Sequence, residues 1–427
     1  MMPSSEYLFT GAFIQFLPGP RKENMPNGIP TGCISKAVQP MNITGKFMGI
    51  ILNLDIKTSF PCLRLKSGSR NAGLRYLKRQ GARYIVPVAE HHDGFAMWDS
   101  DLTEWDAKDK GPNRDIIGEL GEAVRKRGMK YAPSYHRARN WFYYPHFDEF
   151  DTSDPKYAGL YGESHKSTTS AWPGEGNADP SEAFLRDWKK RWEEYRDKYE
   201  PDMLWFDGMW GLDSAFIEMD KQIMADYYNK AREWGKEVAI NNKGGVFRGG
   251  LIPTEVGDYI GGDYMTLDTI NPRKWSNPRG IGHSYGYNKT ETLEDYNNVN
   301  ELVDQLVDIV SKNGNLLLNI GPKADGTIPD IQKERLLGIG RWLGVNGEAI
   351  YGTDYWKTFG EDSIRFTRKG KSTLYAISLT WPNEKLSISS LKNIKKKDIT
   401  SVKLLGSDTE IKWAISKAGL TIEVPKD

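Results

Sequence analysis

Two adjacent histidines follow one of the most apolar stretches of the sequence. His91 and His92 come just after the run at 83–89 (RYIVPVA), and an Asp-Gly pair follows them. Imidazoles at the end of a buried strand can hydrogen-bond a ligand or coordinate a metal ion. Because alternate residues of an extended chain point to opposite faces, we expect the two side chains to diverge. This disfavours a shared metal ion, so we predict hydrogen bonds to hydroxyl groups and no metal site.

Other polar residues end apolar runs in the same way. Asp207 is the most informative of them, because it follows the run at 203–206 and has Trp205 on the same side of the expected strand. A carboxylate at such a place can serve as a nucleophile or as a general acid or base. An aspartate before glycine is also common in turns and caps, and polar loop residues without a ligand remain the alternative. The further members of the set are Tyr135, His136, Trp141, Asn242 and Lys243.

A regular alternation of strands and helices positions these residues. Apolar runs predict strands, and stretches with apolar residues at helical spacing predict helices between them. This order indicates a parallel sheet with right-handed crossovers, and at this length a (β/α)8 barrel. A doubly wound sheet is the alternative, but no glycine-rich phosphate loop follows any strand. The predicted strands are 83–89, 129–135, 201–208, 238–242 and 315–321, with weaker ones at 263–267 and 282–287, and the helices are 114–128, 181–199, 221–237, 301–314 and 331–347.

The last part of the sequence has a different pattern. Short strands separated by turns are predicted at 363–370, 372–381, 401–407 and 420–425. We therefore expect an α/β barrel over residues 81–350 and a small antiparallel β-sandwich over 355–427. Residues 1–80 show little strand or helix pattern. The sandwich is expected to be truncated at its carboxyl end.

Composition excludes several classes of function. The formal net charge is +1, so no nucleic-acid partner is implied. No apolar run reaches the roughly 18 residues of a membrane span, and the first residues lack the pattern of a signal peptide. The chain is rich in tryptophan and tyrosine, which core packing explains more often than sugar binding.

Several motifs, taken together, resemble the α-L-fucosidases of glycoside hydrolase family 29. They are HHDGFAMWDS at 91–100, LWFDG at 204–208, INNKGG at 240–245, the stretch at 308–328 and WLGVNGEAIYGT at 342–353. The resemblance covers most of the chain from about residue 81. It implies a catalytic barrel followed by a β-sandwich, and retaining hydrolysis of terminal α-L-fucosides on fucosylated glycans or oligosaccharides, without a cofactor.

The resemblance also implies roles for individual residues. Asp207 is similar in position to the family's nucleophile, and the position of Lys243 is often held by arginine. The general acid/base is the glutamate that ends a GDYxTxE pattern, where this chain has Asp268. A second arrangement, a glutamate directly after tryptophan, is absent here because Ser276 follows Trp275, so Glu255 and Asp263 are the reserves. The implied sugar contacts are His91, His92, Tyr135, His136, Trp141, Trp205 and Lys243.

The amino-terminal segment departs from the family pattern. Relatives begin their barrel with a strand like FGIFIHWG, and this chain has none. A reading-frame error over this segment is one hypothesis, because a shifted frame permits His-Trp-Gly at residues 9–12 and further family-like residues at 46–58. The chain would then lack its first barrel strand, and the open barrel would expose unpaired edges.

Two other functions remain open at this point. One is an exo-glycosidase for another deoxy or galacto-configured sugar, and the other is a non-catalytic carbohydrate-binding relative. The resemblance is compatible with a secreted, periplasmic or lysosome-like location, and the oligomeric state is open.

Overall fold

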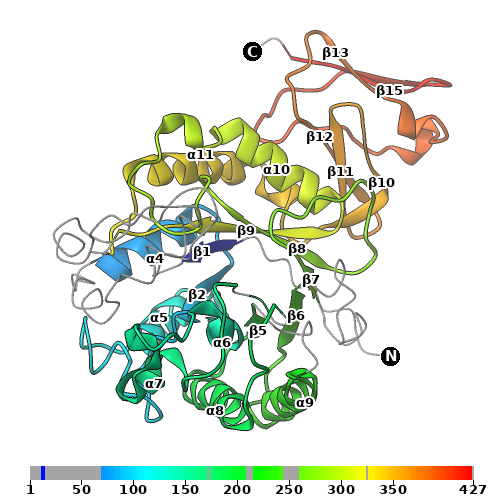
Figure 1. Ribbon diagram of the computed structural model, residues 1–427. Helices are drawn as coiled ribbons and strands as arrows, with labels where there is room; N and C mark the ends of the chain where they lie inside the picture. Colours follow the sequence, from blue (N-terminus) through cyan, green and yellow to red (C-terminus); the bar gives the residue numbers. More distant parts are fainter. Residues whose placement is uncertain are drawn as a thin grey trace.

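The computed structural model describes residues 11–14, 69–170, 172, 175–207, 215–243, 259–323 and 326–425. Most of the anomalous segment and the reserve acid/base Glu255 lie outside the described residues. The described part forms a barrel with a small β domain beside it (Figure 1). No described helix is long and apolar enough to cross a membrane.

The barrel is a closed ring of parallel strands. Nine strands form it, and two short ones, β3 and β4, both pair with β2 and share one position, so the ring has eight positions. β1 pairs in parallel with both β2 and β9 and closes the ring. The strands are β1 (Gly11–Ile14), β2 (Tyr84–Glu90), β3 (Lys130–Tyr131), β4 (Ser134–Tyr135), β5 (Met203–Phe206), β6 (Ala239–Lys243), β7 (Tyr259–Gly261), β8 (Trp275–Gly280) and β9 (Gly314–Ile320).

Helices surround this ring on its outside (Figure 1). Their ends follow capping rules: the side chains of Asp115, Ser181 and Asn298 accept hydrogen bonds from backbone amides in the first turns of α5, α8 and α10. Their apolar faces bury aromatic side chains against the strands, such as Trp188 and Trp192 of α8. The helices are α4 (Ser69–Arg79), α5 (Ile116–Arg125), α6 (Asn140–Tyr143), α7 (Ala158–Tyr161), α8 (Glu182–Tyr199), α9 (Ile217–Glu233), α10 (Val299–Ser311) and α11 (Asp330–Asn346), with 3-10 turns at Arg137–Arg139, Asp151–Ser153, Pro155–Tyr157, Leu293–Asp295, Gly347–Ala349, Ser389–Leu391 and Lys396–Asp398.

The structure corrects the expected organisation of residues 1–80. β1 and α4 both lie within this stretch and belong to the barrel, so the barrel extends beyond 81–350. An open barrel was expected only as a consequence of a reading-frame error, and in the described residues the ring is closed, because β1 occupies the position between β2 and β9. The reading-frame hypothesis itself concerns the gene and stays a prediction.

Two weak strand predictions in the barrel were also wrong. Residues 263–267 and 282–287 lie in loops, and the strands β7 and β8 precede them in the chain. Both strands are short of branched apolar residues, since β7 contains glycine and β8 contains proline and polar residues, which hid their pattern.

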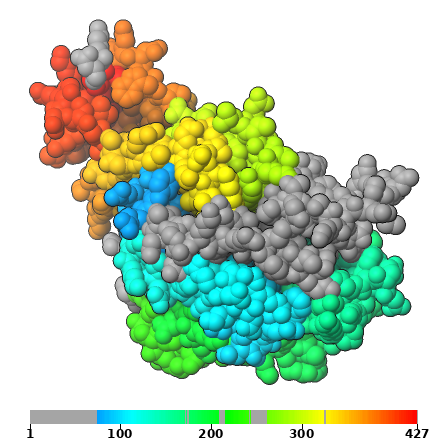
Figure 2. Space-filling view, turned by 90° about the vertical axis from the view of Figure 1, so that its left-hand side faces the viewer, coloured from blue at the N-terminus to red at the C-terminus, as the bar shows by residue number. Residues whose placement is uncertain are grey.

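The β domain consists of two three-stranded antiparallel sheets, as expected for the predicted β-sandwich. It projects from one side of the barrel (Figure 2, orange and red). It is joined to the barrel by polar contacts: Arg365 Nε lies 2.7 Å from Asp308 Oδ1 of α10, and Thr367 donates to the Ala349 carbonyl at 2.6 Å. Residues 401–407, predicted as a strand, form none. The strands are β10 (Asp354–Glu361), β11 (Ile364–Lys369), β12 (Thr373–Ser378), β13 (Lys385–Ile388), β14 (Trp413–Ser416) and β15 (Gly419–Glu423).

Candidate active site

Polar side chains gather at the carboxyl ends of the barrel strands. The strand ladder itself aligns them, because the His136 amide donates to the Glu90 carbonyl at 2.9 Å and the Asp207 amide to the Tyr135 carbonyl at 3.1 Å. Parallel strands place their carboxyl ends at the same rim, which is where active sites of such barrels lie. The group consists of His91 and His92 after β2, His136 after β4, Asp207 after β5, Lys243 at the end of β6 and Asp263 after β7.

Asp207 is held by donors from two neighbouring strand ends. Its Oδ1 lies 2.9 Å from the ammonium nitrogen of Lys243, and its Oδ2 lies 3.2 Å from Nδ1 of His136. The side chain keeps 27% of its surface exposed, so a ligand can still approach the carboxylate. Trp205 forms the floor beneath these contacts, since its ring lies 4.8 Å from the Lys243 nitrogen and 5.6 Å from the His136 ring.

The charges around Asp207 keep it ionised. Burial alone would raise its pKa, but the Lys243 ammonium and the His136 hydrogen bond hold the pKa well below its ordinary value. In the same way, Asp207 and Asp263 raise the pKa of the buried Lys243. Lys243 bridges the two acids, because its nitrogen also lies 3.0 Å from Asp263 Oδ1. An ionised carboxylate with one partly exposed face is suited to nucleophilic attack.

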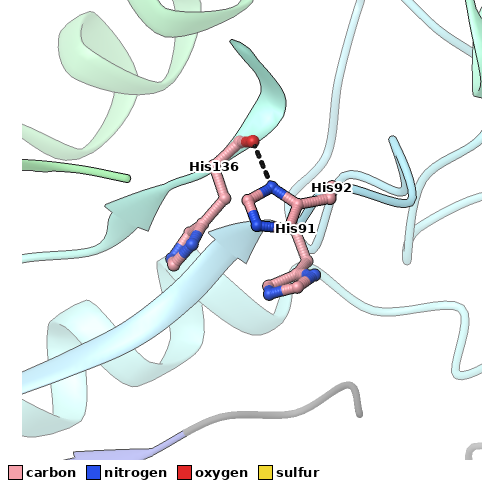
Figure 3. A group of neighbouring side chains, drawn as sticks. All are labelled: His91, His92 and His136. Carbon is pink, nitrogen blue, oxygen red and sulfur yellow. Dashed lines mark hydrogen bonds between the residues drawn. The ribbon is translucent and has the colours of Figure 1, made fainter. Parts of the chain in front are cut away.

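The three histidines form one cluster (Figure 3). His136 connects this cluster to Asp207. The ring centroids of His91 and His92 are 4.3 Å apart, and the His136 ring lies 4.9 and 5.6 Å from them. The expected divergence of His91 and His92 is therefore wrong. The physical reason is that β2 ends at Glu90, so strand alternation does not extend to the two histidines.

The hydrogen bonds of the cluster define its protonation. His92 Nδ1 lies 2.8 Å from the His136 carbonyl oxygen and therefore donates to it. Burial lowers the pKa of His92 to about 3 and that of His91 well below its ordinary value, so both rings are neutral near pH 7. Neutral imidazoles offer one donor and one acceptor each, which suits hydroxyl groups.

The cluster also meets the distance requirement for a metal site. One ring nitrogen from each of His91, His92 and His136 lies within 4.8 Å of the others. However, both ring nitrogens of His136 already have partners, Asp207 at 3.2 Å and the Ser134 hydroxyl at 2.7 Å. A metal ion on His136 would have to displace one of these bonds. We therefore keep hydroxyl binding as the interpretation, and the absence of a metal site stays a prediction.

Comparison with known proteins decides the family. Residues 72–348 match the family described as Alpha-L-fucosidase, and residues 358–427 match its C-terminal domain. The chain belongs to the α-L-fucosidase family. It is 33% identical to mouse tissue alpha-L-fucosidase over 81% of this chain and 71% of that protein, and 33% identical to human plasma alpha-L-fucosidase over 86% and 73%. Among solved structures, Thermotoga maritima alpha-fucosidase in complex with fucose is similar with a TM-score of 0.68 and 31% identity, over 88% of this chain and 79% of that one.

This membership confirms the predicted fold class and the assignment to the glycoside hydrolases. The α-L-fucosidase motif at 91–100 contains residues of the candidate site and residues of the hydrophobic core. Its histidines belong to the site, whereas Phe95, Met97 and Trp98 are buried in the core. Gly94 makes the turn between the two parts, with φ +82° and a close approach to the Leu160 carbonyl, which lies 2.0 Å from where a Cβ would be.

A buried ionic network supports the cluster from behind. Glu90, directly before His91, accepts from Arg137, directly after His136, at 2.7 Å. Arg191 of α8 lies 3.4 Å from the same Glu90 oxygen. Burial raises the pKa of Glu90, and the two guanidinium groups oppose this. The network thus joins the two histidine-bearing strand ends to a helix of the outer layer.

Two predicted sugar contacts of the fucosidase site lie elsewhere. The Tyr135 side chain is buried in the core, where its hydroxyl donates to the Trp188 carbonyl at 2.8 Å. It points outward because it neighbours Ser134 and His136, whose side chains face the barrel interior. Trp141 is buried on α6, stacks on His165 at 3.8 Å and donates to the Ala178 carbonyl at 2.9 Å. Their positions do not support a sugar-binding role for either residue.

The acid/base candidates differ in their surroundings. Asp268 is exposed in the loop between β7 and β8, and no ion pair joins it to another described residue. Asp263 lies in the same loop but contacts Lys243, and the hydroxyl of Tyr285 lies 3.1 Å from its Oδ1. Sequence reasoning placed Asp263 only in reserve, and it missed Ser134 and Tyr143. Tyr143 lies with its ring 5.5 Å from that of His92, and no sequence pattern marks either residue.

Proposed function

We propose that this chain removes terminal α-L-fucosyl units by a retaining double displacement in which Asp207 is the nucleophile. The observation that carries the proposal is the ionised Asp207 carboxylate at the barrel rim, held by Lys243 and His136. Family membership supports the substrate class, and a similar solved structure is named as a complex with fucose.

The reaction has two steps, and the acid/base group donates a proton in the first and accepts one in the second. An Asp207 oxygen attacks the anomeric carbon while the bond to the leaving oxygen breaks, and a protonated carboxyl group gives its proton to that oxygen. The same group then takes a proton from water, which attacks the anomeric carbon and releases Asp207. Oδ1 is the oxygen that faces the Lys243 ammonium at 2.9 Å, whereas Oδ2 faces His136 at 3.2 Å. We therefore assign the attack to Oδ2.

The neutral histidines are proposed to bind the sugar hydroxyls. Because His92 donates through Nδ1 to a backbone carbonyl, its Nε2 is an acceptor for a hydroxyl proton. His91 lies between His92 and His136 and completes the polar surface beside Asp207. Imidazoles held neutral by burial avoid placing positive charge beside the oxocarbenium-like transition state.

The acid/base role has two candidates. The family pattern favours Asp268, whose exposed loop position leaves it able to take part once substrate is bound. Asp263 is supported by distance: its Oδ1 and Asp207 Oδ1 are at most about 5.9 Å apart, since the Lys243 nitrogen lies 3.0 and 2.9 Å from them. Retaining enzymes hold their carboxyl groups about 5 to 5.5 Å apart. We keep Asp268 as the proposal, because Asp263 is already engaged by Lys243.

Covalent trapping tests the nucleophile. A 2-fluoro fucosyl reagent should label the wild-type chain, and peptide mapping should place the sugar on Asp207. Asp207→Asn should lose labelling and turnover of an aryl α-L-fucoside while its circular dichroism stays unchanged. Fucose binding without any label would identify a non-catalytic sugar-binding protein, and label on another carboxylate would overturn the assignment.

Azide rescue tests the acid/base. Asp268→Gly should lose most activity and regain it with azide, an anionic nucleophile that attacks the glycosyl-enzyme in place of water and needs no general base. Asp263→Gly is the matched variant, and Asp408→Gly in the β domain is the control. Rescue of Asp263→Gly with full activity of Asp268→Gly would transfer the role to Asp263.

A further inference from the structure

An exposed tryptophan lies next to a cation at the edge of the candidate active site. Trp172 keeps 37% of its surface exposed, and the Arg139 guanidinium lies 4.0 Å from its ring centroid. Arg139 ends the 3-10 turn that begins directly after His136. Arg139 is therefore the third residue after His136, which contacts Asp207.

Arg139 also lies close enough to the histidine cluster to act on it. Burial chiefly lowers the pKa values of His92 and His91, and the charge of Arg139 adds to this effect. Burial raises the pKa of Tyr143, whose ring packs on His92, and Arg139 opposes that rise. These effects come from the side of the cluster that bears α6. Trp172 therefore lies beside a residue of the turn that leaves the His136 strand end.

Hydrogen bonds of the Asn177 side chain hold the backbone at Trp172. Asn177 donates to the Trp172 carbonyl at 2.8 Å and to the Ser170 carbonyl at 3.0 Å, and it accepts from the Thr168 amide at 2.7 Å. Trp141 anchors the segment by its bond to Ala178. The buried Trp141 thus has a structural contact with the end of this segment.

We infer that Trp172 and Arg139 bind the acceptor sugar, that is, the sugar residue to which the terminal fucose is attached. The C–H face of a pyranose packs well on an exposed indole ring, and the guanidinium offers several donors to its hydroxyl groups. The inference rests on the proposed function, because it assigns the leaving group of that reaction to these residues.

The burial of the site favours an acceptor sugar over fucose as the occupant. His91 and His92 are each only 7% exposed, so the histidine end of the site suits the terminal sugar. Trp172 is about five times as exposed, and its neighbour Arg139 belongs to the turn directly after His136. A glycan that enters with its terminal fucose first would place its next residue toward the more exposed part of the site, where an exposed ring can receive it.

The experiment compares two substrates that differ in their leaving groups. Fucosyl fluoride has no acceptor sugar, whereas a fucosylated disaccharide has one. The disaccharide is the one that the wild-type chain cleaves fastest among (1→2), (1→3), (1→4) and (1→6) linkages. For Trp172→Ala we expect kcat/KM on the disaccharide to fall about tenfold more than kcat/KM on fucosyl fluoride. Trp172→Tyr should restore most of the difference, because it keeps an aromatic face.

Trp381→Ala is the matched control, since Trp381 is 70% exposed in the β domain, and it should leave both rates unchanged. Equal losses of Trp172→Ala on both substrates would overturn the inference, because they indicate a structural effect. A difference of less than twofold would overturn it as well. Failure of the wild-type chain to cleave fucosyl fluoride would instead contradict the proposed function.

Discussion

Replacing Lys243 by methionine isolates the electrostatic control of the proposed nucleophile. Methionine keeps most of the apolar stem and removes the ammonium group that lies 2.9 Å from Asp207 Oδ1. Burial, which raises the pKa of Asp207, is then opposed mainly by His136. Asp207 must be ionised to attack, so activity should be lost at a higher pH than in the wild-type chain.

The size of the change follows from the contact. An opposite charge within about 4–6 Å lowers the pKa of an aspartate by roughly 1–3 units, and the Lys243 side chain is only 10% exposed, so solvent screens it little. We therefore expect the acidic limb of the profile to move up by about 2 pH units. This corresponds to about 3 kcal/mol of lost stabilisation of the carboxylate.

The assay is kcat/KM for an aryl α-L-fucoside measured across pH, because this quantity reports ionisations of the free enzyme. Lys221→Met removes an exposed ion pair on α9 and should leave the profile unchanged. A Lys243→Met variant that loses rate at every pH without any movement of the acidic limb would refute the reasoning. Lys243 would then act on the substrate and not on Asp207.

Three further predictions concern stability, measured by urea unfolding. Burial holds the pKa of His92 at about 3, so the folded chain disfavours the charged imidazole, and stability present above about pH 6.5 is lost as the pH falls. His92 accounts for about 2 kcal/mol of the loss in stability between pH 7 and pH 5, and this loss should be smaller in His92→Asn. Glu90→Gln removes one of the two acids, Glu90 and Asp187, that pair with the buried guanidinium groups of Arg137 and Arg191, and should destabilise the chain by about 3 kcal/mol. Gly94→Ala forces a Cβ onto the Leu160 carbonyl at positive φ and should lower the stability of the chain by at least about 2 kcal/mol. An unchanged midpoint of urea unfolding for Glu90→Gln or Gly94→Ala would contradict the packing described above.

The strands with continuous apolar runs could be predicted from sequence, and those without such a run could not. β2 and β9 are buried along their whole length, and their runs of branched residues identify them. β7 and β8 have no such run, and their strand form depends on pairing with β6 and β9. β1 was not predicted although it contains Ala12, Phe13 and Ile14, because the residues around it show little strand pattern; pairing with β2 and β9 sets its place.

The site residues that could be predicted from sequence are likewise those at the ends of recognisable strands. Asp207, His136 and Lys243 could be found because each ends a strand whose apolar run is visible. Tyr135 was misassigned because the rule that finds strand ends does not say which face a residue occupies. Asp263 could not be ranked above its neighbours, since its contact with Lys243 depends on the path of a loop after a strand without a pattern.

The contact of Lys243 with two acids has a consequence for the relative rates of the two chemical steps. Lys243 contacts both Asp207 and Asp263, so formation of the glycosyl ester at Asp207 neutralises only one of its two acidic partners. The ammonium keeps Asp263 as a partner, and its position does not depend on the charge of Asp207. The same cation can therefore stabilise the carboxylate that leaves in the second step. On this reasoning Asp263→Asn should slow the release of fucose more than its attachment, and the glycosyl-enzyme should accumulate as a burst in pre-steady-state kinetics; a variant without a burst would show that Lys243 needs no second acid.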